Sequence, residues 1–224
     1  MKRPQLVIYG NGHMARMLAE IVSSSYETVA FTVDRELISR PEFCGLPLVP
    51  FDGVETFFPP ARCSMLIAVG YVGMNSIRME RAAAARARGY KLINHIDKTA
   101  RLYPSTDLGD NNVILEYAVL HPGSQVGSAN FIGSNVNLGH GTLMADGCWL
   151  NSGVAIGGEV QLGNGCVFGM NASAAHGISV GEKTFVAANT FLADSSSEGA
   201  VFLSERAIKH RLRSETFLRL LGVV

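Results

Sequence analysis

Apolar residues, all large except Ala174, recur at every sixth position through the middle of the chain, from Leu102 to Leu192, without a slip. A period of six fits neither the 3.6-residue period of a helix nor the two-residue period of an amphipathic strand. Three hexads make one triangular coil, so residues 18 apart stack, and the pattern predicts a parallel β-helix of about five coils. The series consists of Leu102, Leu108, Ile114, Leu120, Val126, Ile132, Leu138, Met144, Leu150, Ile156, Leu162, Phe168, Ala174, Val180, Val186 and Leu192.

Small residues accompany each member of this series. The next position is usually Gly or Ala, as at Gly139 and Ala145, where a Cβ would crowd a tight corner or require a positive φ. The position four residues after the apolar residue is usually small or β-branched, as at Thr142, and is expected to share the interior. Cys148 and Cys166 occupy such interior positions in successive coils, so they are expected to be reduced core residues.

The first hundred residues follow a different pattern, in which short apolar runs alternate with segments of helical spacing. Strand–helix alternation predicts a parallel sheet with helices on its faces, and ligands bind such sheets at the carboxyl ends of the strands. The segment 204–221 is basic and amphipathic, and we expect a helix there that packs on the coils or on a neighbouring chain. The expected strands are 5–9, 27–33, 65–69 and 90–93, the helices 14–22 and 75–87, and the domains 1–98 (α/β), 99–197 (β-helix) and 198–224 (helical tail).

The first strand runs into a glycine turn, Gly10-Asn11-Gly12-His13, which resembles the dinucleotide fingerprint G-x-G-x-x-A. A complete dinucleotide fold needs two such halves, so this one is expected to hold a mononucleotide, such as the nucleoside diphosphate of an activated sugar. The phosphates would lie at the amides of the turn. Asp34 would accept a hydrogen bond from the ribose or base. A tight turn without a ligand remains the alternative.

Composition excludes several classes of protein. The 224 residues carry no net charge and are 47% hydrophobic, which suits an ordinary soluble protein of two domains and does not suggest nucleic-acid binding. The sequence shows neither a transmembrane run nor a signal peptide. The four cysteines have no metal-site spacing. We therefore expect a cytoplasmic protein without a metal.

His140 is the most conspicuous polar residue of the coils. It follows the interior residue Leu138 by two places, so it should project outward near a corner, and Gly158 lies one coil above it. An imidazole beneath a bare glycine amide can serve as base and oxyanion donor in acyl transfer. His176 lies two coils above His140. A solvated corner histidine remains the alternative.

These features together resemble the nucleotide-sugar acetyltransferases of the sialic-acid O-acetyltransferase superfamily, of the bacillosamine and perosamine N-acetyltransferase type. The resemblance spans nearly the whole chain, through YGNGHMARMLAEI, the TVD strand end, AVGYVGMNSIR, GYKLINHI and the coils. It implies a left-handed parallel β-helix behind a half-Rossmann domain. It also implies a homotrimer that transfers acetyl from acetyl-CoA to an amino sugar on a nucleoside diphosphate, with CoA between adjacent β-helices.

The resemblance assigns roles to individual residues. His140 falls on the general base, and Gly158 on the glycine whose amide meets the thioester carbonyl. The remaining acyl-donor positions are Trp149, Met170, His176 and Ala188, and the nucleotide-sugar positions are Gly10, Asn11, Gly12, His13, Asp34, Arg35, Gly70, Asn75 and Arg78. For Arg78, a solvated position on a helix face is an open alternative.

Two departures from the family stand beside His140. Gly141 replaces the acidic residue that often follows the base, and Trp149 replaces a second histidine nine residues on. A different group would then orient the imidazole, with Asn135, Asn137 or a neighbouring subunit as candidates. Trp149 could pack on pantetheine, on a larger acyl chain or at the trimer seam. The segment 195–199 also departs from the family where the last coil ends.

The sequence thus predicts an acetyl-CoA-dependent N-acetyltransferase acting by direct transfer. An O-acetyltransferase, a transferase with another acyl donor and a non-catalytic nucleotide-sugar-binding trimer remain open. An NAD-dependent enzyme is disfavoured because the coils would then have no role. Neither the nucleoside nor the sugar can be deduced from the residues.

Overall fold

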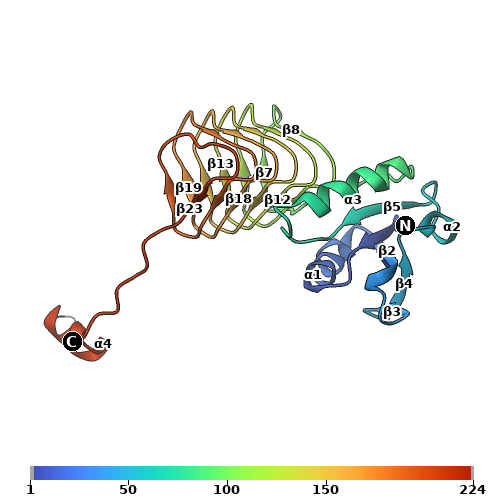
Figure 1. The fold of residues 1–224 in the computed structure, drawn as a ribbon, viewed down its shortest axis with the longest axis horizontal. Coiled ribbons are helices and arrows are strands. Elements are labelled where there is room, and N and C mark those ends of the chain that lie inside the picture. Colours follow the sequence, from blue (N-terminus) through green and yellow to red (C-terminus); the bar gives the residue numbers. More distant parts are fainter. Residues whose placement is uncertain (1–2, 223–224) are drawn as a thin grey trace.

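The computed structural model describes residues 3–222. An N-terminal α/β part is followed by a stack of coils, and a short helix lies beyond them (Figure 1). The predicted succession of a half-Rossmann sheet, a parallel β-helix and a C-terminal helix is confirmed. The N-terminal elements are β1 (Gln5–Tyr9), α1 (His13–Ile21), η1 (Val22–Ser24), β2 (Glu27–Val33), η2 (Arg35–Leu37), β3 (Glu42–Phe43), β4 (Leu46–Pro50), α2 (Val54–Phe57), β5 (Cys63–Ile67) and α3 (Ser76–Ala87).

The N-terminal sheet has the order β3-β4-β2-β1-β5, and all its pairings are parallel except that of the edge strand β3 with β4. The strands predicted over 5–9 and 27–33 are confirmed, whereas the next lies at 63–67 rather than 65–69. The strand predicted at 90–93 is wrong. Only Leu92 forms a bridge, to Met65, because the chain already turns into the first coil, where His95 pairs with Val113.

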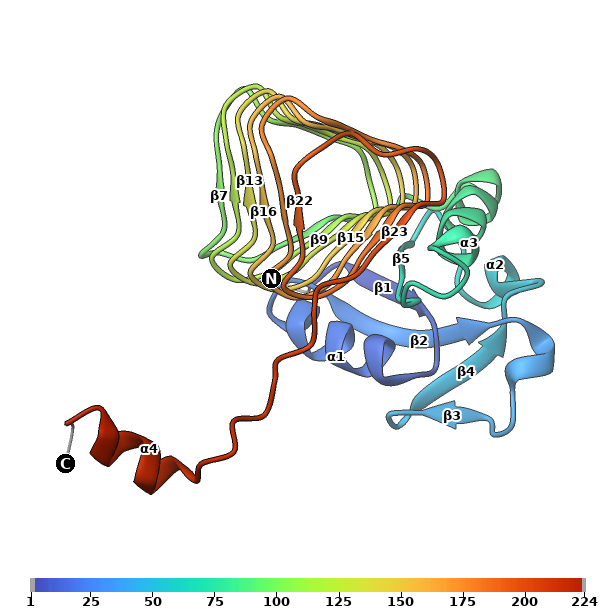
Figure 2. The same cartoon turned by 60° about the vertical axis from the view of Figure 1, so that its left-hand side comes forward.

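The coils form a triangular prism with three parallel sheets as its faces (Figure 2). Stacked residues are 18 apart, as Leu138 and Ile156 are, so the predicted register is confirmed. The β6 sheet contains β6 (His95–Ile96), β9 (Val113–Ile114), β12 (Phe131–Ile132), β15 (Trp149–Leu150), β18 (Val167–Phe168), β21 (Phe185–Val186) and β23 (Val201–Phe202). The β7 sheet contains β7 (Arg101–Leu102), β10 (Val119–Leu120), β13 (Asn137–Leu138), β16 (Ala155–Ile156), β19 (Ser173–Ala174) and β22 (Phe191–Leu192). The β8 sheet contains β8 (Asp107–Leu108), β11 (Gln125–Val126), β14 (Leu143–Met144), β17 (Gln161–Leu162) and β20 (Ser179–Val180).

The apolar series fills the prism. From Ile114 to Leu192 each member is at most 5% exposed, and up to Thr190 the residue four places later is buried with it. Cys148 and Cys166 are buried free thiols, as predicted, and their sulfurs each lie 3.2 Å from a carbonyl oxygen of the next coil. Removing this surface from water is the main stabilising term of a solenoid that has no other core.

The glycines after the apolar residues are required for space rather than for backbone freedom. A Cβ at Gly139 would lie 2.4 Å from the amide nitrogen of Gly158, and the φ of Gly139 is not positive. Positive φ occurs two residues later in each corner instead, at every sixth residue from Asn111 to Asn189. Most of these residues are Gly or Asn, but Glu159 is among the exceptions, with a φ of 59°.

The last coil is two residues shorter than the others. Val180 pairs with Ser196 and Phe185 with Val201, each two positions earlier than a full coil would give, so the unusual segment 195–199 closes a smaller turn. The chain then leaves the coils as an extended segment that ends in α4 (Ser214–Leu220), which lies apart from them (Figures 1 and 2). The prediction that this segment packs on its own coils is wrong, since Ile208 is 95% exposed. Packing on a neighbouring chain stays a prediction.

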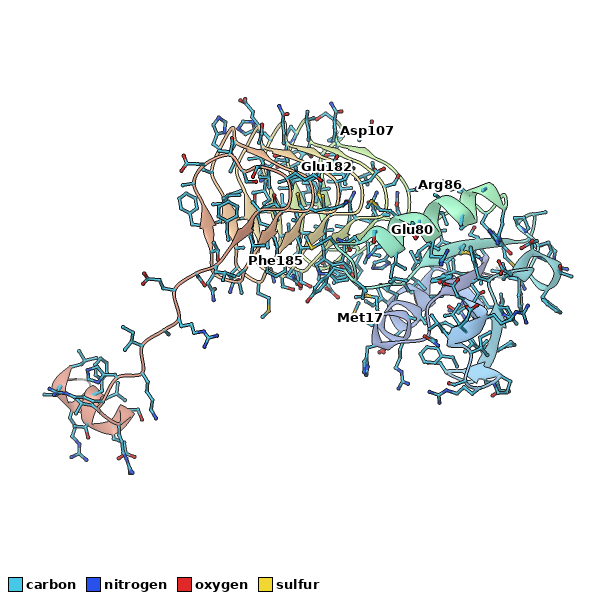
Figure 3. All side chains as sticks on the ribbon, in the orientation of Figure 1. Met17, Glu80, Arg86, Asp107, Glu182 and Phe185 are labelled. Atoms are coloured by element: carbon cyan, nitrogen blue, oxygen red, sulfur yellow. The ribbon has the colours of Figure 1, made fainter. Side chains whose placement is uncertain are left out.

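The N-terminal part covers the β6 sheet. Four outward residues in the middle of this sheet are apolar and buried with residues of β1 and α1, whereas Val201 on its last strand is 63% exposed. Outward residues of the other sheets, such as Asn137 and Gln125, are exposed. Arg86 on α3, beside the coils (Figure 3), forms an ion pair with Asp110 at a coil corner. The buried outward residues are Val113, Phe131, Trp149 and Val167, which pack with Leu6, Ile8 and Leu18.

Candidate active site

The glycine turn opens into a cavity of about 450 Å³ at the carboxyl ends of β1, β2 and β5. Six of the nine residues predicted to bind the nucleotide sugar line it: Gly10, Asn11, Gly12, His13, Asp34 and Gly70. Their side chains and amides converge because parallel strands end at the same edge of a sheet. The remaining lining residues include Tyr9, Leu37, Val72, Ile77 and Arg81.

Two glycines of the turn serve different purposes. Gly10 has a φ of 137°, and a Cβ there would lie 2.7 Å from the carbonyl oxygen of Ala68, so the fold itself requires glycine. Gly12 precedes the first residue of α1, and no protein atom lies within 4 Å of the place of its Cβ. The open space therefore adjoins the free amides of a helix N-terminus, an arrangement that suits a phosphate group.

Arg81 is the principal cavity residue that the sequence interpretation missed. Its guanidinium donates to the Asp34 carboxylate at 2.7 Å and to the Tyr9 hydroxyl oxygen at 3.0 Å. Burial raises the pKa of Tyr9, so its phenol stays neutral at physiological pH. One Asp34 oxygen is thus already occupied by Arg81. The signal available in the sequence was the spacing of Arg81, one helical turn beyond Arg78.

Three predicted residues do not line this cavity. Arg35 borders an adjacent polar cavity of about 270 Å³ that shares Asp34 and Arg81 with it. Asn75 and Arg78 are fully buried. Asn75 adopts a φ of 64° at the start of α3, where asparagine is one of the few residues that tolerate the left-handed conformation.

The structure contradicts both readings of Arg78, as a phosphate-binding and as a solvated residue. Its guanidinium lies at the junction of the two parts and donates to the carbonyl oxygens of Asn130 at 3.2 Å and Asn111 at 3.4 Å. Burial lowers the pKa of Arg78 to about 10, so the side chain remains charged at neutral pH. The guanidinium lies 5.6 Å from the ring centre of Trp149. Arg78 therefore anchors the α/β part to the coils.

Trp149 also belongs to this junction. Its ring stacks on Phe131 with 4.0 Å between centroids, and Tyr71 packs against it edge-on at 5.3 Å. Only 4% of Trp149 is exposed, so within one chain the ring presents little surface to an acyl donor. The ring instead connects the coils to the 70–74 loop, whose residues Gly70 and Val72 border the nucleotide-sized cavity.

His140 lies at the edge of the prism between the β7 and β8 sheets, and its side chain is exposed. A Cβ at Gly158 would lie 2.6 Å from the Nε2 atom of His140, so the imidazole sits directly against the bare glycine. The His176 ring follows one coil further on, with its centroid 6.0 Å from that of His140. The predicted stacking of these three residues is confirmed.

The Gly158 amide has no acceptor among the hydrogen bonds of residues 3–222. Its carbonyl oxygen is occupied by the amide of Gly177 at 2.9 Å. The edge thus offers a free N–H beside an imidazole, the two groups that acyl transfer needs. The charge of a tetrahedral oxyanion is stabilised by such a preorganised donor.

The remaining acyl-donor positions lie elsewhere on the prism. Met170 and Ala188 occupy the edge between the β6 and β7 sheets, one face away from His140. The His140 edge also lies opposite the β6 sheet, which carries the N-terminal part. A single chain therefore does not bring the nucleotide-sized cavity and His140 together.

No group of three or more His, Cys, Asp or Glu side chains within residues 3–222 is arranged to hold a metal ion. No helix among these residues is long and apolar enough to cross a membrane.

Comparisons with solved structures find close similarity in fold. The acetyltransferase domain of PglB from Neisseria gonorrhoeae FA1090 matches with a TM-score of 0.79 at 22% identity, over 89% of this chain and 96% of that one. PerB from Caulobacter crescentus, solved with CoA and GDP-perosamine, matches with a TM-score of 0.77 at 22% identity, over 88% and 92%. WeeI from Acinetobacter baumannii AYE matches with a TM-score of 0.64 at 14% identity, over 88% and 94%.

No protein-family model matches the chain, and no curated protein matches its sequence. The similarity therefore rests on the fold, which extends over nearly nine-tenths of this chain. The structural resemblance to hexapeptide-repeat β-helix acetyltransferases that the sequence predicted is confirmed at the level of the fold.

Proposed function

We propose that this protein is an acetyl-CoA-dependent N-acetyltransferase that acts on the amino group of a nucleoside-diphosphate-linked sugar. The observation that carries the proposal is the exposed His140 imidazole seated against bare Gly158, whose amide is free. In addition, the cavity at the glycine turn is of nucleotide size and lies at the amides of a helix N-terminus. The similarity in fold to PglB and to PerB, the latter solved with CoA and GDP-perosamine, supports the same reaction class.

In the proposed mechanism, neutral His140 accepts a proton from the sugar amine as the nitrogen attacks the thioester carbonyl carbon. The Gly158 amide donates to the oxyanion that forms, and collapse of the intermediate expels CoA. General-base assistance of this kind contributes about 10²–10⁴-fold to the rate. Held in this geometry, the two substrates react directly, without an acyl-enzyme.

We further propose that the site is completed between copies of the chain in a homotrimer. The cavity and His140 lie on opposite sides of one β-helix, so a neighbouring copy must present its nucleotide sugar to the His140 edge. Met170 and Ala188 of one copy could then line the CoA channel beside His140 of another, which accounts for their separation in a single chain.

Mass spectrometry tests the reaction directly. UDP-, GDP- and dTDP-linked 4-amino sugars are each incubated with acetyl-CoA and protein, and one product is expected to gain a single base-stable acetyl group. A base-labile product would indicate an ester and hence an O-acetyltransferase. Tight nucleotide binding without acetylation of any acceptor would support a non-catalytic trimer. His140→Asn is expected to lower kcat/KM by about 10²–10⁴-fold without a change in Tm.

A further inference from the structure

Three ionisable side chains occupy successive coils at the His140 edge. His140, Glu159 and His176 all project outward there, and Glu159 Oε2 lies 3.7 Å from Nε2 of His176. The two imidazoles are separated by the bare Gly158, which leaves the space between them open. The mechanism above uses only the first of these three groups.

Glu159 is held over the corner of His140 by the stacking of the coils. Its amide donates to the His140 carbonyl oxygen at 2.7 Å, and a Cβ at Gly141 would lie 3.5 Å from the Glu159 Cγ. From this position its carboxylate reaches His176 rather than His140. Gly141, which follows His140 in the sequence, carries no carboxylate. The next coil supplies Glu159, whose carboxylate contacts His176 instead.

The backbone at Glu159 indicates that the glutamate is present at a conformational cost. Its φ of 59° is left-handed, and ten of the fourteen corner residues that share this conformation are Gly or Asn. A long side chain is disfavoured in the left-handed region by contact between its Cβ and the backbone. Residues kept in such conformations cluster at functional sites, which points to a role for this carboxylate.

Resting on the proposed acetyl transfer, we propose that His176, held by Glu159, is the proton donor to the departing CoA sulfur. The N–C bond forms as His140 takes the amine proton, and the C–S bond breaks as the His176 imidazolium gives its proton to sulfur. The products are an amide and a thiol. His140 is left protonated and His176 neutral, and exchange with solvent restores both.

The surroundings of the two imidazoles support this division of roles. Glu159 is the carboxylate within 4.0 Å of His176, whereas among residues 3–222 no carboxylate lies that close to His140. Asp194 lies one coil beyond His176 in the sequence, but it forms no ion pair with it in the described structure. His176 and Glu159 are 63% and 64% exposed, so their attraction is weak until a bound acyl donor excludes water.

A double-mutant cycle separates this role from a structural one. His176→Asn is expected to lower kcat by about 10- to 100-fold with little change in KM for acetyl-CoA. This effect is at the low end for acid catalysis because a thiolate is a good leaving group even without a proton. Glu159→Gln should lower kcat less, and the double variant should be no slower than His176→Asn alone. Glu182 is a carboxylate at another edge of the coils (Figure 3). Glu182→Gln is therefore the matched control and should leave kcat unchanged.

A stability measurement and an NMR measurement complete the test. Glu159→Asn should raise Tm, because asparagine suits the backbone there, and still lower kcat. If kcat stays at the wild-type value, or the Glu159 and His176 losses multiply, the inference is overturned while acetyl transfer stands. In imidazole ¹⁵N spectra with bound CoA, Glu159→Gln should shift the His176 signals and leave those of His140 in place, because the carboxylate contacts only His176. His176 signals that do not change in Glu159→Gln overturn the inference even if no acceptor is ever acetylated.

Discussion

Gly158→Ala tests the contact on which the proposed reaction depends. The added methyl would lie 2.6 Å from Nε2 and 2.8 Å from Cε1 of His140, whereas ordinary contacts begin at about 3.4 Å. The imidazole must therefore move by roughly 0.8 Å, since the methyl is attached to a backbone fixed by the coils. A misplacement of about 1 Å costs on the order of 10²-fold in rate, or about 2.7 kcal/mol of transition-state stabilisation.

The fold should tolerate this change. The φ of Gly158 is not positive, and the atoms that the methyl meets belong to the end of an exposed side chain, which can swing aside. Thermal unfolding should give the wild-type Tm to within a few degrees, while kcat/KM for acetyl transfer falls by about 10²-fold. The amide N–H is retained in alanine, so the loss reports on the imidazole rather than on the oxyanion donor.

The same substitution in a His140→Asn background is the control. If the methyl acts only by displacing His140, it should add less than about twofold to the loss already caused by His140→Asn. A Gly158→Ala enzyme that keeps more than a third of the wild-type kcat/KM would refute the reasoning. The reasoning would also be refuted if adding Gly158→Ala to His140→Asn lowered kcat/KM by the same factor as it does in the wild-type enzyme.

Three further predictions concern stability. Trp149→Ala should lower the unfolding free energy in urea by about 3–5 kcal/mol, because it removes a ring buried between the two parts and exposes charged Arg78; a loss below about 1 kcal/mol would contradict this. Burial lowers the pKa of His95, so the unfolded chain binds more protons below about pH 6.5. Stability should therefore be complete above that pH and fall as the pH is lowered, a dependence that should weaken in His95→Gln. Truncation after Ser204 removes a segment that lies apart from its own coils, so packing of this segment on a neighbouring chain predicts a drop of several degrees in Tm, and an unchanged Tm would contradict that packing.

The fold was predictable because a repeat constrains every position. Each sixth residue is apolar and is followed four residues later by a second interior residue. Only one register of the coils buries both, and the residues from Ile114 to Leu192 adopt that register. The strand at 90–93 failed because only Leu92 bridges to Met65 before the chain turns into the coils, although Tyr90 and Leu92 pack in the core of the α/β part. Strand β4, LPLVP, escaped prediction because its two prolines obscure a short strand, although its pairing with β2 is parallel.

The parts of the site that depend only on the residue spacing of the coils or on a local turn were predictable. The stacking of His140, Gly158 and His176 needs only the constant length of the coil, and the cavity at Gly10–Gly12 needs only a strand that ends at a helix. Arg78 and Trp149 could not be placed in this way. Both were assigned to ligands because a charged and an aromatic side chain suit ligands, and the packing of one part of the chain on the other buried them instead.

The sequence by itself determined the register of the coils and the glycine turn, because both depend on residues whose spacing along the chain sets their spacing in the structure. Only the tertiary structure decided which face of the prism the N-terminal part covers, since that contact joins residues far apart in the sequence, such as Leu6 and Trp149. The docking buries Arg78 and Trp149, and it sets the cavity that holds the Asp34–Arg81 pair opposite His140.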